Sequence, residues 1–413
     1  MPETGPKSAP QTAPERRPIP TERTRTRPFD PPPDLGDLRT REPVCPVAMA
    51  DGANGWLLTR HADVHAVLGD HQRFSSRGDL RSSALDSQVT AARAARPGEV
   101  NAVDPPEHTR LRRKLAGKFT TSRMARLSER ITAIVDETLD RMERHGPPVD
   151  LVEAFASPVP SLVICELLGV DYAQRAEFQE RTRQMLRLGA GAEQFVTAVE
   201  EMAGYVGRLV EAKRAAPTDD VLGALAADEE LTTEEVSRMG LALLAAGHET
   251  TAHMLALGTF ALLRHPDQLA ALRADPGLVN GAVEELLRYL TIAQYGAERS
   301  ATEDVEVGGR LIRRGEVVVP ALMAANRDPQ RFADPDALDV RRQAAGHVAF
   351  GFGIHQCLGQ QLARIELRIG YRALLARFPT LRLAVPPQDV PLRTDSLTYG
   401  VAELPVEWDR TGH

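Results

Sequence analysis

The chain has 413 residues, 42% of them hydrophobic, and a formal net charge of −7. A chain of this length buries roughly 75% of the surface that its unfolded form exposes, so its fold does not depend on disulfide bonds. Three scattered cysteines, an acidic balance and the lack of an apolar run of about 18 residues exclude a disulfide-rich scaffold, a basic nucleic-acid binder and a transmembrane helix. We therefore expect a soluble cytoplasmic protein that contacts neither membrane nor nucleic acid.

The N-terminal part of the chain is rich in proline. Residues 1–33 hold ten of the 30 prolines and few large apolar residues, so they cannot bury enough surface to offset the entropy cost of ordering. We predict a flexible Pro-rich tail over 1–33, followed by a single domain over 34–413. The polar stretch at 78–101 indicates a long loop within that domain, of the kind that often covers a binding site.

The rest of the chain has mostly helical periodicity. Thr232 and Glu235 form a capping box that opens the longest helical pattern, and Pro266 ends it. One helix is expected to start just after the prolines at 105–106. The other expected helices are 62–68, 122–144, 161–168, 173–188, 192–215, 221–227, 233–264, 266–274, 278–289 and 358–378. Strands are expected at 56–60, 306–307, 310–312 and 317–319, with hairpin turns at 308–309 and 314–315. These patterns predict a mainly α fold with a smaller β region.

The stretch at 350–364 reads FGFGIHQCLGQQLAR, a glycine-rich turn followed by a cysteine and a helix-forming run. A thiol at a helix N-terminus meets unpaired backbone N–H groups, which favour the metal-ligating thiolate. Gly351, Gly353 and Gly359 allow tight turns or the close approach of a flat partner. From these residues alone, Cys357 is either a metal ligand or a buried structural cysteine.

The middle of the longest predicted helix reads AAGHETT at 245–251. Gly247 and the two threonines are poor residues for a helix interior, because glycine costs about 1 kcal/mol and threonine hydroxyls capture nearby carbonyls. Such a centre indicates either a local bulge or kink at a functional site, or a point of close helix packing.

Phe350, Gly353, Cys357 and Gly359 stand in the pattern Phe-x-x-Gly-x-x-x-Cys-x-Gly. This pattern resembles the haem-binding loop of the cytochrome P450 superfamily, and the likeness, nearest to soluble actinobacterial members, covers about residues 35–410. The resemblance implies a P450-like fold and a haem b cofactor. It makes Cys357 the ligand of the haem iron, with Phe350 and Gly359 beside the cofactor.

The stretch at 245–251 resembles the oxygen-binding groove of the same family, Ala-Gly-x-Glu/Asp-Thr-Thr. The resemblance implies that Ala246 borders the haem, that Thr250 hydrogen-bonds dioxygen or water, and that Glu249 belongs to the proton-delivery path. A hydroxyl with a nearby acid can pass protons inward from solvent. His248 points away from this face by helical spacing and is expected to be structural.

Glu285 and Arg288 lie one turn apart on a predicted helix, where they form either an ordinary surface pair or a special one. They resemble the Glu-x-x-Arg motif of the family, in which the pair is buried and joined by a further arginine. We expect Arg342, or failing that Arg341, to be the third member. The role of the group would be to hold the cysteine loop in register.

Four basic residues are implied to bind the two propionates of haem. His108 and Arg112 lie on one helix face and match the pattern His-Thr-Arg-x-Arg of the family, while Arg299 and His355 complete the set. A buried dianion calls for such groups, although each could also be an ordinary surface charge.

The resemblance implies a monooxygenase that hydroxylates or epoxidises a small organic substrate. The chain has no flavin- or nicotinamide-binding stretch, so we expect a separate ferredoxin and its reductase to supply electrons to a monomeric enzyme. By resemblance, the substrate pocket includes Ala242, Ala245, Ile292, Gln294, Tyr295 and Leu397. The small residues leave room and Gln294 and Tyr295 add polarity, which suggests a bulky secondary metabolite such as a macrolide or other polyketide, as in antibiotic biosynthesis.

Three alternatives stay open at this point. The chain could be a non-catalytic P450-like module that recruits a partner or carrier protein, although the intact Cys357 and Thr250 argue against this. It could also be a haem-thiolate enzyme that uses peroxide or couples substrates oxidatively. Finally, the basic residues at 110–118 could dock an acidic ferredoxin or be a solvated helix face.

Overall fold

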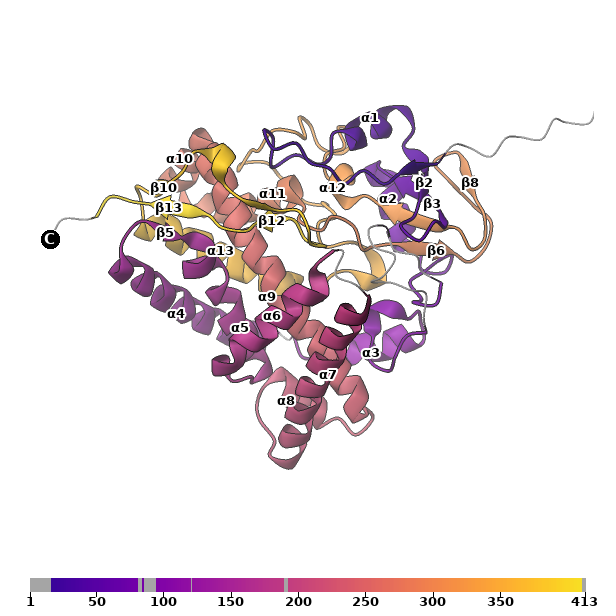
Figure 1. The fold of residues 1–413 in the computed structure, drawn as a ribbon, viewed down its shortest axis with the longest axis horizontal. Coiled ribbons are helices and arrows are strands. Elements are labelled where there is room, and N and C mark those ends of the chain that lie inside the picture. The colour runs from indigo at the N-terminus through magenta and orange to yellow at the C-terminus, as the bar shows by residue number, and fades with distance from the viewer. Residues whose placement is uncertain (1–15, 81–83, 85–93, 120, 189–191, 411–413) are drawn as a thin grey trace, which may run out of the picture.

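Helix α9 (Thr233–Arg264) runs through the middle of the protein, and the other helices pack around it, as Figure 1 shows for the computed structural model. The structure describes residues 16–80, 84, 94–119, 121–188 and 192–410. The predicted capping box opens α9, because the Thr232 hydroxyl accepts from the Glu235 backbone N–H and the Glu235 carboxylate accepts from the Thr232 backbone N–H. Buried residues occur on all sides of α9, which is the pattern of a helix enclosed by protein.

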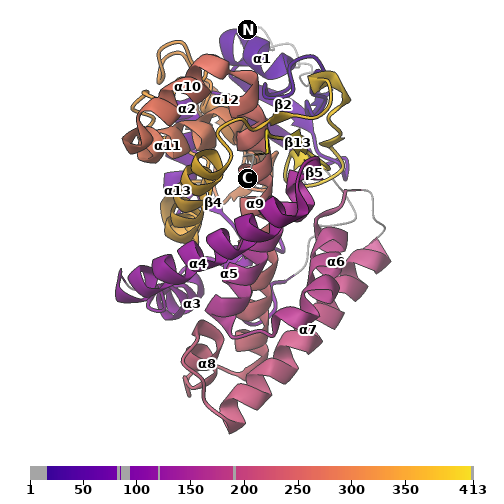
Figure 2. The ribbon, with the colours of Figure 1, turned by 90° about the vertical axis from the view of Figure 1, so that its left-hand side faces the viewer.

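The helices that surround α9 form most of the fold. α5 (Pro158–Leu168), α7 (Ala192–Ala215) and α13 (Gln360–Arg377) contact α9 directly. Figure 2 shows α6 (Arg175–Leu186) lying beside α7 on one flank of α9. Further helices are α1 (Asp34–Arg41), α2 (His61–Gly69), α3 (Glu107–Ala116), α4 (Thr121–His145), α8 (Val221–Ala226), α10 (Pro266–Ala274), α11 (Val279–Leu290) and α12 (Leu322–Ala325).

Two glycines let neighbouring helices approach α9 closely. A Cβ atom on Gly247 would lie 2.6 Å from the Cδ1 atom of Ile164 on α5. A Cβ atom on Gly258 would collide with the hydroxyl of Tyr371 on α13, which donates to the backbone carbonyl of Met254. These contacts fix α5 and α13 tightly against the central helix.

The strands form one larger sheet and several small ones. The larger sheet has the order β1-β2-β3-β9-β6-β4 and lies on the right in Figure 1, away from α4. Its strands are β1 (Arg17–Pro18), β2 (Val44–Ala48), β3 (Asn54–Leu58), β4 (Phe74–Ser75), β6 (Arg299–Ala301) and β9 (Val317–Pro320). The small sheets contain β5 (Val149–Asp150), β7 (Val305–Val307), β8 (Arg310–Ile312), β10 (Arg382–Leu383), β11 (Leu392–Arg393), β12 (Gly400–Val401) and β13 (Pro405–Glu407).

One of the two predicted hairpins is present and the other is not. β7 and β8 pair antiparallel across the predicted turn at 308–309. β9 does not fold back on β8 across 314–315, because it pairs parallel with β3 and antiparallel with β6 in the larger sheet. All four residues of β9 are buried, so its apolar side chains are better placed in that sheet than in a two-stranded hairpin.

The predicted tail over 1–33 is wrong for its second half, while residues 1–15 lie outside the described part of the chain. β1 pairs parallel with β2, and Ile19 and Phe29 are buried. The ring of Phe29 meets Phe260 of α9 edge-on at 5.0 Å between centroids. The composition argument fails here because a few apolar anchors hold the segment, together with hydrogen bonds from side chains to its backbone. In one of these, the Tyr295 hydroxyl donates to the Pro20 carbonyl at 2.7 Å.

The predicted fold class, mainly α with a smaller β region, is confirmed. Half of the predicted loop over 78–101 lies outside the described residues, namely 81–83 and 85–93. Among the residues that the structure describes, no helix is both long enough and apolar enough to cross a membrane.

Candidate active site

The loop before α13 places Cys357 at the N-terminal end of that helix. Gly351 and Gly353 have φ angles of +69° and +75°, a left-handed conformation that side chains disfavour. The Cys357 backbone N–H donates to the Phe350 carbonyl at 2.9 Å and closes the loop. The Cys357 side chain is exposed, whereas the other two cysteines are buried.

The protonation of Cys357 depends on opposing influences. The surrounding protein raises the pKa of the thiol by desolvation, even though the side chain remains open to solvent on one side. The backbone N–H groups of Gly359 and Gln360 and the charges of Arg112 and Arg364 act in the opposite direction. The helix N-terminus acts toward the thiolate as expected, but desolvation outweighs it and the pKa of the thiol is raised overall.

The centre of α9 is α-helical at every residue, so the predicted bulge is absent there. The Thr250 hydroxyl donates to the Ala246 carbonyl at 2.8 Å, which adds a bond without breaking the helix. Gly247 is instead the close packing point against Ile164, which was the other interpretation of this stretch. Ala246 is exposed and Thr250 half-buried, although both lie on the central helix of the molecule.

Glu249 sits in a small polar network that the sequence analysis did not find. Its Oε1 atom accepts from Arg393 Nη1 of β11 at 2.9 Å and lies 3.7 Å from His253 Nε2. His253 Nδ1 is in turn 3.0 Å from the Thr398 hydroxyl. Desolvation raises the pKa of Glu249, and the nearby charges of Arg393 and Arg183 lower it in part. The spacing of four residues could have indicated His253, but no local signal points to Arg393, 144 residues away.

Glu285 and Arg288 form a fully buried ion pair on α11. The guanidinium donates from Nε and Nη2 to the two carboxylate oxygens at 2.7 and 2.8 Å. Arg342 donates from Nε to Glu285 Oε1 at 3.1 Å, whereas Arg341 is exposed. Arg342 also donates to the backbone carbonyl of Asp334 at 2.9 Å, so the group ties α11 to the segment before the cysteine loop.

Three of the four expected propionate-binding residues lie near one another. The rings of His108 on α3 and His355 in the cysteine loop are 4.2 Å apart between centroids. Arg112 donates to the carbonyl of Gln356 and so lies beside the same loop. Arg299 on β6 is buried, and its guanidinium donates to the backbone carbonyls of Glu298 and Ala297 at 2.9 and 3.1 Å, just before the strand begins.

These residues fit a flat, anionic, metal-containing cofactor. Neither ring nitrogen of His108 meets hydrogen-bond geometry with a described residue, although the ring is buried and the Ile354 backbone lies close enough to act on its pKa. A buried polar ring of this kind calls for an additional partner. Apart from its own chain neighbours, no described atom lies within 4 Å of where a Gly359 Cβ would stand, so the loop leaves open space at this residue, two positions after the thiol. The donor set of one thiol with nearby histidine and arginine matches haem b with its two propionates.

The expected substrate-pocket residues fall into two groups. Gln294 donates from its backbone N–H to the Leu397 carbonyl at 3.2 Å, and Ile292 accepts from the Tyr399 backbone N–H at 2.8 Å. Ile292, Gln294 and Leu397 therefore lie together, and Ala242 and Ala245 are partly exposed on α9.

Tyr295 does not join this group. Its side chain is buried in a separate hydrophobic cluster with residues of the N-terminal segment, and its hydroxyl donates to the Pro20 carbonyl. It therefore offers no polar contact to a substrate, because successive residues of an extended segment point to opposite sides.

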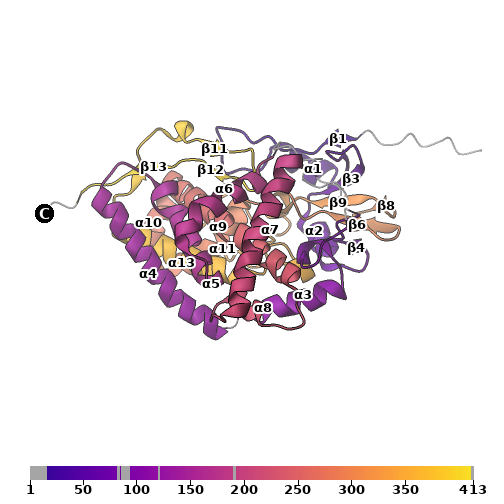
Figure 3. The ribbon, with the colours of Figure 1, turned by 60° about the horizontal axis from the view of Figure 1, so that its bottom comes forward.

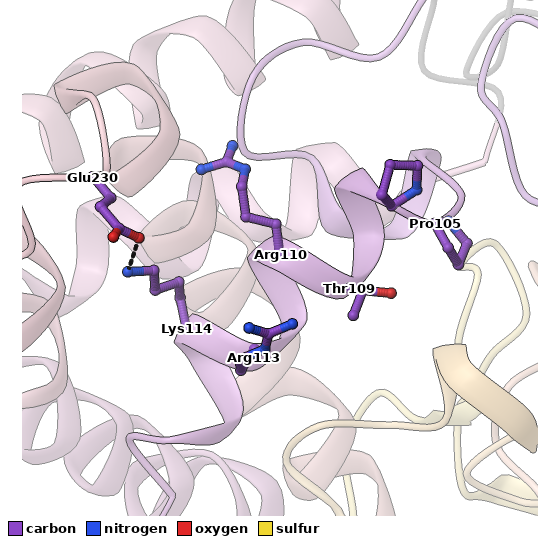
Figure 4. Close-up of a pocket in the computed structure, with 7 residues that line it drawn as sticks. Pro105, Thr109, Arg110, Arg113, Lys114 and Glu230 are labelled. Carbon is purple, nitrogen blue, oxygen red and sulfur yellow. Dashed lines mark ion pairs between the residues drawn. The ribbon is translucent and has the colours of Figure 1, made fainter.

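The basic helix α3 borders a cavity of about 600 Å³, shown in Figure 4. Figure 3 shows that α3 lies next to α8. The ion pairs of this region are Arg110 with Glu107 and Glu235, and Lys114 with Asp228 and Glu230. Arg110 and Lys114 are thus largely neutralised, whereas Arg113 is exposed.

The thiol at the start of α13, the Glu249 and Thr250 side chains on α9 and the buried Glu-x-x-Arg pair are the groups of a haem-thiolate oxygenase site. The family model described as Cytochrome P450 matches residues 191–407, and the chain belongs to this family. It is a cytochrome P450 monooxygenase with the cofactor haem b, and the expected P450-like fold is confirmed.

The most similar proteins found include Streptomyces enzymes. The chain is 50% identical to cytochrome P450 105C1 of a Streptomyces species, over 92% of this chain and 96% of that protein. The structure of CYP105P1 in complex with filipin I superimposes with a TM-score of 0.90 at 43% identity, covering 96% of this chain and all of the other. The mycinamicin VIII C21 methyl hydroxylase MycCI of Micromonospora griseorubida, bound to mycinamicin VIII, gives a TM-score of 0.85 at 38% identity, covering 91% and 96%.

The two left-handed glycines of the cysteine loop should respond differently to alanine. At Gly351, no described atom lies within 4 Å of the new Cβ, so Gly351→Ala should cost only the backbone strain of about 1–2 kcal/mol. At Gly353, the new Cβ would collide with the Leu68 carbonyl oxygen, so Gly353→Ala should cost ~3 kcal/mol or more and weaken haem retention. Urea unfolding and haem-transfer rates test this, and equal costs would contradict it.

Proposed function

We propose that this monooxygenase inserts one oxygen atom of O2 into a bulky, partly oxygenated secondary metabolite such as a macrolide or another polyketide. The observation that carries the proposal is the joint presence of three features. These are the exposed Cys357 thiol, the Thr250–Glu249 pair and the small residues Ala242, Ala245 and Ala246 on the same helix as that pair. The named complexes of two related structures, with filipin I and mycinamicin VIII, support the substrate class. The enzyme is proposed to act as a monomer whose single domain covers the predicted residues 34–413 and also takes in residues 16–33, since β1 and Phe29 pack into it.

When bound, haem b supplies the activation of O2 and the oxidising power. Cys357 would ligate its iron, and Gly359 leaves space beside the thiol for the porphyrin. The charged groups of the site would bind the two propionates, namely His108, Arg112, Arg299 and His355. The buried group of Glu285, Arg288 and Arg342 would hold the cysteine loop in register, because it links α11 to the segment before that loop.

The reaction needs both electrons and protons. Hydroxylation converts a C–H bond and O2 into an alcohol and one water molecule, and it consumes two electrons and two protons. Glu249 would take protons from solvent past Arg393, whose side chain is 25% exposed, and Thr250 would place them in the groove. The Thr250 hydroxyl donates to the Ala246 carbonyl in this structure, so it must rotate or accept a proton before it can serve in this path.

The carbonyl difference spectrum and a substrate screen test this proposal. The reduced protein with CO should give the band of thiolate-ligated haem. Titration with filipin I and mycinamicin VIII should shift the ferric spectrum, because a bulky substrate would exclude solvent from the haem side of the pocket, whereas a small terpene should not. A spectrum that small terpenes shift and both macrolides leave unchanged would overturn the substrate class without affecting the haem-thiolate assignment.

The electron donor is proposed to be an acidic ferredoxin that docks near α3. Of the basic residues on this helix, Arg110 and Lys114 are occupied by carboxylates, so Arg113 should contribute most to long-range attraction. Lys118 follows α3 and is half-buried.

Arg113→Glu should therefore raise the KM for ferredoxin roughly tenfold at low salt, with a smaller effect at high salt, since the charges act mainly on the encounter rate. NADPH oxidation at varied ferredoxin concentration measures this effect. Arg41→Glu on α1, on the opposite side of the molecule in Figure 1, is the matched control and should leave KM unchanged. Equal effects of the two variants on KM would contradict docking near α3 and would mean that the basic residues of this helix are simply solvated.

A further inference from the structure

His253 occupies a position between the acid of α9 and a turn in the C-terminal segment. Its Nε2 atom is 3.7 Å from Glu249 Oε1 and its Nδ1 atom is 3.0 Å from the Thr398 hydroxyl. The ring has little freedom, because the Gly400 backbone lies against it and a Cβ there would come within 2.8 Å of its Cγ. Burial lowers the pKa of His253 to about 3, so the ring is neutral at physiological pH.

A neutral histidine carries one N–H, and the surroundings decide where it is. A bare Nε2 atom facing the Glu249 carboxylate would be repelled, so the hydrogen belongs on Nε2. Nδ1 is then an acceptor, and the Thr398 hydroxyl donates to it. The hydroxyl of Thr398 thus fixes the form of His253 that attracts the Glu249 carboxylate.

Thr398 belongs to a turn that is held by the segments around the expected substrate pocket. The Leu397 backbone N–H donates to the Leu186 carbonyl at the end of α6 at 3.0 Å. The Gln294 side-chain amide donates to the Ser396 carbonyl at 2.7 Å, and Thr398 forms an isolated bridge with Ala293. A molecule that displaces this turn would therefore also move the donor to His253.

The Glu249 carboxylate has few other attachments. Its Oε1 atom accepts from Arg393 and lies 3.7 Å from His253 Nε2, which is longer than a hydrogen bond, while its Oε2 atom has no hydrogen-bond partner in the part of the chain that the structure describes. A group of this kind takes its orientation from the contacts of one oxygen, so a change at His253 alters where the carboxylate points.

We propose that His253 is a positioning residue that links the Glu249 carboxyl to the turn at 395–398, so that occupancy of the substrate pocket sets the orientation of the proton-delivering acid. This inference rests on the proposed function, in which Glu249 delivers protons and Leu397 lines the pocket. It adds a residue that acts on the reaction without touching substrate or cofactor. The contact of His253 with Glu249 and its contact with Thr398 can be removed by separate substitutions.

The first test reads the tautomer directly. In the diamagnetic reduced CO complex with ¹⁵N-labelled histidine, the signals that disappear in His253→Phe belong to this residue. They should report a neutral ring with the hydrogen on Nε2, and Thr398→Val should change this population while Thr398→Ser should not. A ring protonated on Nδ1 in the unaltered protein, or an unchanged signal in Thr398→Val, would overturn the proposal.

The second test reads proton delivery without needing the natural substrate. Dithionite-reduced enzyme is mixed with O2 in H2O and in D2O, and the return to the ferric state is followed. His253→Phe and Thr398→Val should each slow this return by roughly 3- to 10-fold and raise the solvent isotope effect, as expected when a supporting residue is lost. The double variant should be no slower than either single one, because both cut the same link.

Two comparison variants separate the possible failures. Glu249→Gln should slow the return more than either link variant, and no change in it would overturn the proposed role of the acid itself. Normal behaviour of both link variants beside a slow Glu249→Gln would overturn the role of His253 alone. Arg382→Ala, at an exposed ion pair on β10, should leave both the rate and the isotope effect unchanged.

Discussion

Replacing Cys357 by serine is expected to abolish the carbonyl band of thiolate-ligated haem and to reduce monooxygenase activity by more than the roughly 10- to 100-fold that loss of a supporting residue costs. Serine keeps the size and the loop hydrogen bond from the residue 357 backbone N–H to Phe350, so the fold should survive. Its hydroxyl stays protonated next to iron where a thiol gives up its proton. The reduced-plus-CO difference spectrum and product formation are the measurements.

The matched control is Cys45→Ser. Cys45 lies in β2 with its side chain fully buried, and its thiol interacts with the Pro46 carbonyl at 3.6 Å. This change should lower stability somewhat but leave the carbonyl spectrum as it is. An unaltered thiolate-type band in Cys357→Ser would contradict the ligand assignment and with it the whole description of the site.

Glu285→Ala is expected to lower the free energy of unfolding by about 3–5 kcal/mol and to produce protein that retains haem poorly. The reason is that both charged groups of the pair are 0% exposed, so removal of the carboxylate strands the Arg288 guanidinium in the interior. Arg342 loses the same partner at once. Urea unfolding of the haem-loaded protein, with haem absorbance as a second probe, measures both effects.

Two further variants make this test specific. Arg342→Ala removes a partly exposed group and should cost less than Glu285→Ala, but it should affect haem retention because the arginine contacts the segment before the cysteine loop. Arg382→Ala breaks an ion pair whose members are 50% and 40% exposed, and should leave stability nearly unchanged. A Glu285→Ala protein as stable as Arg382→Ala would show that the buried group is dispensable.

Much of the helical architecture could be predicted because its signals are local. The capping box at Thr232 and the proline at 266 mark the ends of α9, and the structure has the helix over the predicted range. α7 likewise has its predicted ends. The prediction of a second hairpin, between β8 and β9, was wrong. β9 pairs instead with β6 and with β3, and β3 lies more than 200 residues earlier in the chain, so no local pattern indicates the pairing.

The site shows the same division between local and distant signals. The cysteine loop and the stretch around Thr250 are continuous in sequence, so their residues could be named without a structure. Arg393 reaches Glu249 from β11, and no pattern near either residue indicates the contact. Tyr295 was predicted to face the substrate pocket, but its side chain points toward the N-terminal segment, where its hydroxyl donates to the Pro20 carbonyl. No sequence pattern near residue 295 indicates that this distant segment covers it.

The contact between Tyr371 and Gly258 has a consequence for how closely α13 and α9 pack. α13 begins beside the sulfur of Cys357, and the phenol farther along that helix inserts against α9, whose centre carries Ala246. The distance between α13 and α9 at this crossing is therefore set by the Tyr371 hydroxyl on one helix and the missing side chain of Gly258 on the other. Any side chain at residue 258 would push apart the two helices that carry, at other points along their length, the groups of the site.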